Sequence, residues 1–211
     1  MNWFLIQKST INLFIFFCFS LFMEKVSMVI ECPECKGKAL MTEFIKEIPF
    51  FGRTLFSNLS CKECNFNLND ISSDSEKQPT KYSVQINSEK DLSVKIVKSS
   101  TSTVQVPELG VRIEPTVNSQ GYFTNIEGLL NKIEESLSFT ASLEEEEKDA
   151  KDLKEKLFKK INDAKNVKFT FTVIVEDPFG NGALIGKKVK KELLNKKQLS
   201  ELKTRMSFLE H

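Results

Sequence analysis

Cys32-Pro33-Glu34-Cys35 and Cys61-Lys62-Glu63-Cys64 are the two stretches that decide the fold of this 211-residue chain. In each stretch two residues separate the cysteines, a spacing that lets two thiolates of one tight turn reach the same tetrahedral ion. The 25 residues between the stretches are long enough for an out-and-back pair of strands that brings the turns together. Four cysteine ligands leave no open position for water or substrate, so the pattern predicts one structural zinc ion.

Other roles for the cysteines fit the sequence less well. A redox Cys-x-x-Cys motif needs a following helix, and no helical pattern follows Cys35. Tetrahedral sulfur sites can also hold iron. Disulfides suit a secreted chain, but five cysteines in 211 residues are few for that class. Because metal binding supplies the folding free energy of such sites, we expect residues from about Val29 to Ile71 to be disordered without metal.

The composition argues against catalysis and against a general attraction to nucleic acid. Thirty basic residues nearly balance 29 acidic ones, so no net field favours a polyanionic partner. The single histidine is the last residue, His211. A Ser-His, Cys-His or His-metal catalytic arrangement therefore cannot be built in the body of the protein. No two carboxylates are convincingly paired in the sequence, and we expect no enzymatic activity.

Residues 1–27 form an apolar extension that differs from the rest of the chain. Its main apolar run, Leu13–Met23, is 11 residues long, which is too short to span a bilayer by itself. No small-residue cleavage site of a signal peptide follows it. Met28 is a natural first residue for a protein that begins with its zinc turn. Three interpretations stay open: an artefact of the assumed start codon, a membrane anchor and a packed helix. We expect the protein in the cytoplasm, where residues 1–27 would still allow association with a membrane.

The rest of the chain divides into parts by its periodicity. Short alternating apolar runs with turn residues between them predict a sandwich or barrel rather than a parallel α/β sheet. Helical spacing interrupts this pattern and predicts a helical hairpin, after which alternation returns. The predicted parts are a finger at 28–71, a linker at 72–81, a β domain at 82–186 with the hairpin at about 124–164, and a basic amphipathic helix at 187–211.

Five stretches outside the cysteines carry a family signature, in this order: Glu47–Phe51, Asp91–Ser99, Val106–Leu109, Gly121–Leu130 and Asp177–Asn181. With them the chain resembles the ZPR-type zinc-finger family, in the single-module form found in archaea, from about Val29 to Ile185. Two positions depart from the family pattern. Asn65 stands where glycine is usual, although asparagine tolerates left-handed backbone. Ser100 replaces a usual acidic residue, which puts the charge interaction of that acid in doubt.

The resemblance implies a fold and a function. The fold is α+β and mainly β: a zinc-ribbon-like finger, similar to that of a translation initiation factor, precedes a double-stranded β-helix with a helical-hairpin insertion. Eukaryotic relatives carry two such modules, bind translation elongation factor 1-alpha, the GTPase that delivers aminoacyl-tRNA, and assist its folding. The resemblance thus implies a protein partner, a structural Zn²⁺ and no enzymatic activity.

Apolar residues of two family stretches are candidate contacts for that partner: Ile48, Pro49, Phe50, Phe51 and Phe179. For Phe50 and Phe51 there is an alternative, because small metal domains need apolar side chains to fill the core between the zinc turns.

A second function stays open, that of an RNA- or ribosome-binding zinc ribbon. Basic residues surround the metal turns, and the C-terminal segment from residue 187 carries eight basic residues against three acidic ones. Glutamates also lie throughout the finger, so the sequence forms no clear positive stripe.

Overall fold

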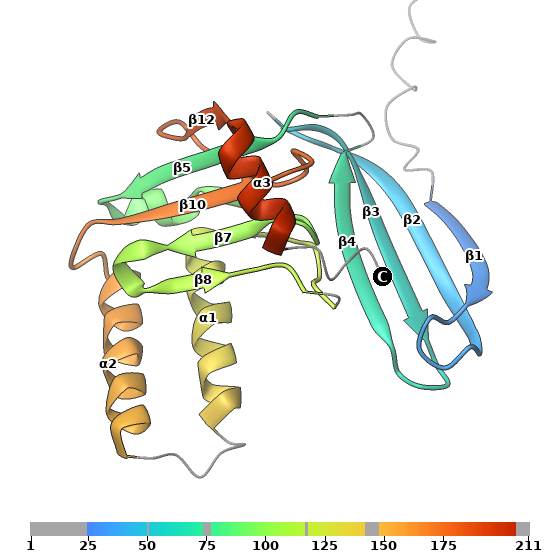
Figure 1. The fold of residues 1–211 in the computed structure, drawn as a ribbon, viewed down its shortest axis with the longest axis horizontal. Coiled ribbons are helices and arrows are strands. Elements are labelled where there is room, and N and C mark those ends of the chain that lie inside the picture. Colours follow the sequence, from blue (N-terminus) through green and yellow to red (C-terminus); the bar gives the residue numbers. More distant parts are fainter. Residues whose placement is uncertain (1–24, 50, 74–76, 117, 142–147, 206–211) are drawn as a thin grey trace, which may run out of the picture.

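The computed structural model describes residues 25–49, 51–73, 77–116, 118–141 and 148–205. Within these ranges a four-stranded finger lies beside a β domain that carries two long helices (Figure 1). The open interpretations of the N-terminal extension fall mainly on residues 1–24, outside the described residues. The first described strand begins at Lys25, three residues before Met28. The division into domains stays a prediction.

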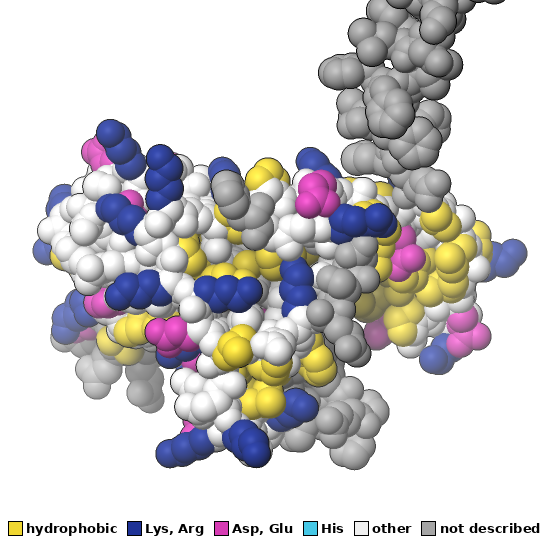
Figure 2. Space-filling model, turned by 90° about the horizontal axis from the view of Figure 1, so that it is seen from above, with side chains coloured by type: hydrophobic (Ala, Val, Ile, Leu, Met, Phe, Trp, Pro, Cys, Tyr) yellow, Lys and Arg dark blue, Asp and Glu magenta, His cyan; other side chains and the backbone are white. Residues whose placement is uncertain are grey.

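The finger is an antiparallel sheet in the simplest order. Its strands are β1 (Lys25–Glu31), β2 (Lys38–Ile48), β3 (Gly52–Cys61) and β4 (Asn67–Ser73), each paired with the next. Strand β4 is nearest to the β domain and β1 is the far edge (Figure 1). Hydrophobic side chains gather on the finger, whereas lysines and arginines are spread over the β domain (Figure 2).

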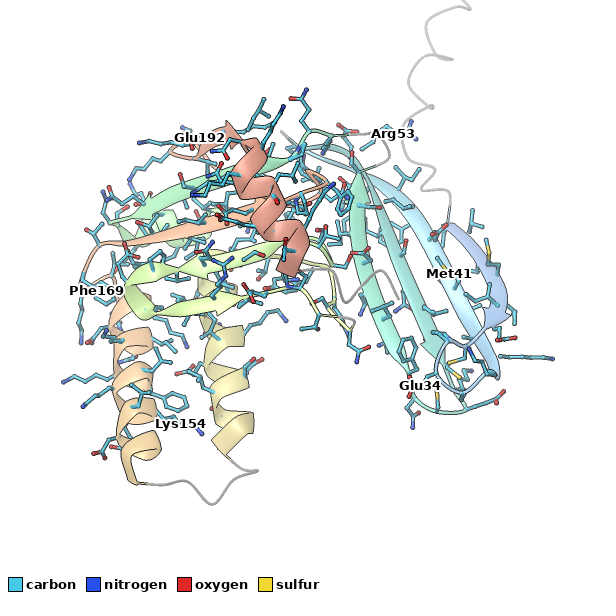
Figure 3. All side chains as sticks on the ribbon, in the orientation of Figure 1. Glu34, Met41, Arg53, Lys154, Phe169 and Glu192 are labelled. Carbon is cyan, nitrogen blue, oxygen red and sulfur yellow. The ribbon has the colours of Figure 1, made fainter. Side chains whose placement is uncertain are left out.

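The two ends of the finger have different roles. The cysteine turns join β1 to β2 and β3 to β4 at one end, marked by Glu34 in Figure 3, and the β2–β3 turn lies at the opposite end, marked by Arg53. Near the middle, the rings of Phe44 and Phe56 stack with their centroids 4.9 Å apart. The zinc turns and the β2–β3 turn therefore sit in separate environments.

The β domain encloses one apolar core between two sheets. Side chains from both sheets, including Ile86, Ile96 and Phe171, are fully buried in it. The five-stranded sheet has the order β12-β5-β10-β7-β8 and the three-stranded sheet the order β11-β6-β9. The strands are β5 (Thr80–Ile86), β6 (Lys95–Lys98), β7 (Thr103–Val106), β8 (Val111–Ile113), β9 (Tyr122–Asn125), β10 (Phe171–Asp177), β11 (Ala183–Ile185) and β12 (Lys190–Leu193).

Two helices lie between β9 and β10 in the chain, α1 (Ile126–Ala141) and α2 (Lys148–Lys165). The Asn125 side-chain oxygen accepts the backbone N–H of Gly128 at 2.8 Å and so caps α1. Apolar residues at helical spacing on both helices are buried against the β core, among them Leu130 and Ile161. The expected mainly β fold with a helical insertion between strands is confirmed.

The C-terminal segment differs from its prediction as one amphipathic helix. It first forms β12 on the free edge of β5, and only then α3 (Lys196–Arg205). The N–H of Leu194 also donates to the carbonyl of Pro79 at 3.0 Å. An unpaired sheet edge favours a further strand even where the sequence, here Lys-Lys-Glu-Leu, has no apolar alternation. Strand β4 ends at Ser73 and β5 begins at Thr80, so strand residues occupy both ends of the stretch 72–81 that was predicted as a linker.

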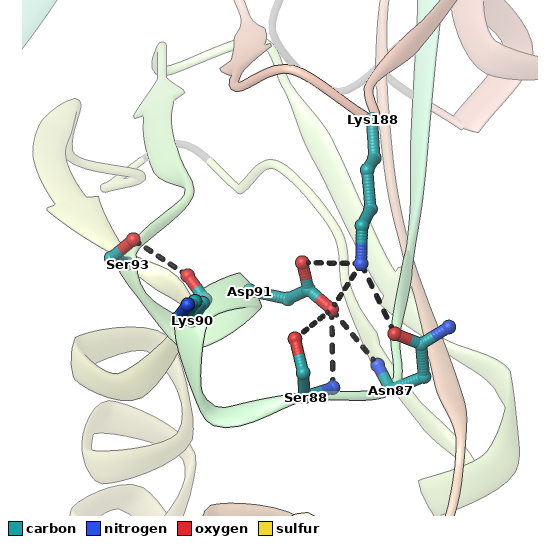
Figure 4. A network of polar contacts seen from close by, with 6 residues as sticks. All are labelled: Asn87, Ser88, Lys90, Asp91, Ser93 and Lys188. Carbon is teal, nitrogen blue, oxygen red and sulfur yellow. Dashed lines mark hydrogen bonds and ion pairs between the residues drawn. The ribbon is translucent and has the colours of Figure 1, made fainter.

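A buried carboxylate fixes the start of this segment to the β domain (Figure 4). Asp91 lies in a short 3-10 helix, Glu89–Ser93, and forms an ion pair with the Lys188 ammonium at 2.9 Å. It also accepts the hydroxyl of Ser88 at 2.8 Å and the N–H groups of Ser88 and Asn87. Burial opposes ionisation of Asp91, but Lys188 and Ser88 lower its pKa on balance.

We expect Asp91→Asn to lower the free energy of unfolding by about 2 kcal/mol at pH 7. Because the folded-state pKa of Asp91 is depressed, its contribution is present above about pH 4 and is lost as the pH falls through the folded-state value. The difference between the variant and the parent should therefore shrink in acid. Urea unfolding at several pH values measures it, with Glu89→Gln, an exposed neighbour, as the control. An equal loss for both variants would contradict the prediction.

Candidate metal centre and its surroundings

Both cysteine turns are closed by backbone hydrogen bonds. In the first, the N–H of Cys32 donates to the carbonyl of Gly37 at 2.8 Å, and in the second the N–H of Cys61 donates to the carbonyl of Phe66 at 2.8 Å. The residue after each pair has left-handed backbone, with φ of 63° at Lys36 and 59° at Asn65. Asparagine thus occupies the conformation that glycine would adopt, and the turn is intact.

The four sulfur atoms converge on one point. The Sγ atoms of Cys32 and Cys64 are 3.7 Å apart and those of Cys35 and Cys61 are 3.6 Å apart, and all four lie within 4.8 Å of one another. A tetrahedral zinc ion with Zn–S bonds of about 2.3 Å separates its sulfurs by about 3.8 Å. The spacing fits one zinc ion with all four positions taken by protein. When bound, the ion cross-links the two turns.

The acidities of the thiols reflect this crowding. Backbone hydrogen bonds, first from Cys35, lower the pKa of the Cys32 thiol to about 7 in spite of its burial. The pKa of Cys35 moves to about 12: the backbone of Gly37 lowers it, but the neighbouring Cys64 sulfur and burial raise it more. Four thiolates at this distance repel one another unless a cation lies between them, and a bound zinc ion would supply that positive charge.

Apolar side chains pack behind the cysteines. Ala39, Leu59 and Phe66 contact the buried Cys32 and Cys61 and fill the core between the zinc turns. Phe51, which was the alternative candidate for this position, lies instead in a separate cluster at the other end of the finger. The interpretation that Phe51 fills the core between the zinc turns is therefore wrong, and the same interpretation for Phe50 stays a prediction because that residue lies outside the described ranges.

Two of the five candidate contact residues attach the finger to the β domain. Ile48 and Phe51 are only 5% and 8% exposed, and they pack against Val97 and Ala183. The ammonium of Lys77 lies 3.3 Å from the centroid of the Phe51 ring. Ile48 and Phe51 thus form part of the junction rather than a free surface.

The other candidate contact residues have different positions. Pro49 is exposed, and Phe179, in the turn between β10 and β11, is 49% exposed. Phe50 lies outside the described residues. Of the four residues of this set that the structure describes, Phe179 and Pro49 are the two that a partner can reach directly.

Polar contacts reinforce the junction between the finger and the β domain. The N–H of Gly121 donates to the carbonyl of Asn69 at 2.8 Å, and a Cβ at Gly121 would lie 2.5 Å from the nitrogen of Ile71. Ser100 donates its N–H and its hydroxyl to the Asp70 carboxylate at 2.9 and 3.0 Å. An acidic side chain at position 100 would face Asp70, so serine suits this chain.

A buried polar cluster at the same junction has no counterpart among the predicted site residues. The carboxylate of Asp177 is fully buried and accepts the hydroxyls of Ser99 and Ser102 at 2.5 and 2.7 Å. Lys98, 2% exposed, donates to the carbonyl of Ser99 at 3.0 Å, and burial lowers its pKa although Asp70 and Asp177 oppose this. The sequence signal was present, since Lys98, Ser99 and Asp177 lie in two of the family stretches.

Comparison with known proteins identifies the family. A model of the ZPR1 zinc-finger domain matches residues 24–79 and a model of the ZPR1 jelly-roll domain matches residues 90–204. The chain belongs to the ZPR1 family. Uncharacterised ZPR1-like proteins of Pyrococcus horikoshii and Methanocaldococcus jannaschii are each 37% identical to it. The alignments cover 82% and 86% of this chain, and 79% and 91% of those proteins, so these archaeal relatives also have a single module.

A more distant family member carries a functional name. The zinc finger chaperone zpr1 of Schizosaccharomyces pombe is 31% identical over half of this chain, which spans 23% of that protein. In the part of the chain that the structure describes, the four cysteines are the only group of three or more His, Cys, Asp or Glu residues placed to hold a metal ion. Among the same residues, no helix is long and apolar enough to cross a membrane.

Proposed function

We propose that this chain is a non-enzymatic protein-binding module that binds translation elongation factor 1-alpha, or its archaeal counterpart, and assists its folding. The name of the Schizosaccharomyces pombe relative supports a chaperone role. A closed four-cysteine site supports a structural rather than a catalytic use of the zinc ion, since such a site has no position for substrate.

The exposed ring of Phe179 is the observation that carries this proposal. Its backbone N–H donates to the buried Asp177 carboxylate at 2.8 Å. Gly180 follows in left-handed backbone with φ of 71°, and Asn181 accepts the N–H of Ser73 in the finger at 3.0 Å. A half-exposed aromatic ring on a turn that is fixed on both sides loses little entropy on binding, which is typical of an interface anchor.

We expect Phe179→Ala to weaken binding to the elongation factor about tenfold or more without changing the thermal midpoint of unfolding. Phe123→Ala is the matched control, because Phe123 is 45% exposed but lies on β9. Calorimetric titration with the purified factor measures both. Equal weakening by the two variants would contradict the assignment of Phe179 as an anchor.

Affinity purification of the tagged chain tests the proposal as a whole. The elongation factor should co-purify, and this should depend little on moderate salt. RNA recovered instead, with an affinity that falls steeply between low and moderate salt, would contradict the proposal and support the ribbon alternative.

A further inference from the structure

Among the residues that the structure describes, no strand pairs with the outer edge of β1, and the strand has an apolar surface. It pairs with β2 on one side, and its other side faces away from the β domain (Figure 1). Eight large hydrophobic residues of the described chain are exposed, and four of them lie on β1 or directly beside it on β2, with 44% to 65% of their surface accessible. These four are Val26, Met28, Val29 and Leu40. Figure 2 shows hydrophobic side chains gathered on the finger, at its right.

This edge lacks the usual protection against pairing. Natural proteins place charges, proline or bulges along an exposed edge strand. In β1 the charged residues are only Lys25 and Glu31, the first and the last of seven, and the residues between them are apolar apart from Ser27. A regular seven-residue strand with such a centre is suited to receive another strand.

We propose that β1 pairs with β1 of a second copy of this chain, antiparallel and about a two-fold axis through Met28, so that two fingers form one eight-stranded sheet. In this register Met28 lies opposite Met28 and Val26 lies opposite Ile30. Lys25 of each copy lies opposite Glu31 of the other. The partner is thus a second copy of the same strand, with opposite charges at both ends.

Symmetry and charge together select this register. A two-fold axis perpendicular to the sheet leaves every side chain on the same face of the sheet in both copies. Residues that lie opposite each other in an antiparallel pair also share a face, so the axis must pass between two copies of one residue. Of these registers, only the one centred on Met28 pairs all seven residues and also joins both opposite charges. A shift would leave Lys25 beside an apolar residue or unpaired.

The neighbouring strand adds to the apolar contact. Met28 lies opposite Met41 in β2, and Val29 lies opposite Leu40. The dimer would therefore place the side chains of Met41, Met28, Met28 and Met41 in a row across four adjacent strands. Glu31 already has an ion pair with Lys36, but at 3.9 Å and with both side chains 70% exposed this contact is weak and does not compete.

Complementary charge reversals in the full chain test the pairing. Lys25→Glu places like charges opposite each other at both ends of the strand pair, and Glu31→Lys does the same with the other sign. Each variant alone should raise the dissociation constant of the dimer about tenfold. A mixture of the two variants should restore the parent value.

In the mixed dimer the glutamate introduced at position 25 meets the lysine introduced at position 31, and at the other end the unchanged Lys25 meets the unchanged Glu31. Sedimentation velocity over a concentration series measures both variants and their mixture.

Lys46→Glu is the matched control, since Lys46 is an exposed lysine in β2 beyond the last residue that pairs with β1, Phe44. This variant should dimerise like the parent. One zinc ion per chain in every variant shows that the fingers are folded. A monomeric parent at micromolar concentration would overturn the proposal. So would single variants that associate like the parent, or a mixture that does not recover, and the β1 edge would then be left to an occupant other than a second copy.

Discussion

Replacing Cys61 with serine is expected to abolish tight zinc binding and to unfold the finger while the β domain stays folded. Cys61 is buried, and its sulfur lies 3.6 Å from that of Cys35 across the metal position. Structural zinc contributes about 10–16 kcal/mol in small metal domains, which is more than the finger can supply from its few buried apolar side chains. The core of the β domain contains none of the four ligands.

Hydrogen exchange measured peptide by peptide separates the two outcomes. Protection should be lost across residues 25–71 and kept in β5, β7 and β10, both in Cys61→Ser and after chelation of the parent protein. Cys18→Ser, at the fifth cysteine, should leave one zinc ion per chain. A finger that keeps its protection without metal would refute the structural role of the site.

The zinc site was predictable because its ligands are defined by local spacing. Two residues between cysteines and a tight turn suffice to bring each pair together, and the strands between the pairs were long enough to align them. The helical hairpin was predictable for a similar reason, since residues such as Leu130 and Ile161 recur at helical spacing and are buried as expected. In both cases the physical cause acts over a few residues of chain.

The junction was not predictable, because its contacts join residues far apart in sequence. Nothing local in Ile48 and Phe51 indicates that they pack against Val97 and Ala183 rather than face solvent. Strand β12 is a related case: three of the four residues of Lys190–Leu193 are charged and all four are exposed, and the strand forms because the edge of β5 is available. Such elements depend on the partner surface and not on their own pattern.

Replacing Asp177 with alanine is expected to lower the free energy of unfolding by about 3–5 kcal/mol at pH 7. The change removes the carboxylate that accepts the buried hydroxyls of Ser99 and Ser102. These two hydroxyls are 2.9 Å apart, so one of them can donate to the other but both cannot be satisfied in this way. The N–H of Phe179 loses its partner as well. Each buried donor without an acceptor costs about 1–3 kcal/mol, because water cannot reach it.

Urea unfolding followed by circular dichroism measures the loss, and two variants calibrate it. Asp177→Asn keeps one acceptor oxygen and should lose less stability than alanine. Asp163→Ala removes only a surface ion pair with Lys168 and should lose no more than about 1 kcal/mol. If Asp177→Ala were no less stable than Asp163→Ala, the cluster would not hold the turn. The turn held by Asp177 also positions Phe179, so Asp177→Ala should bind the elongation factor less tightly than Asp163→Ala does. The stability of the junction and the proposed contact are therefore linked.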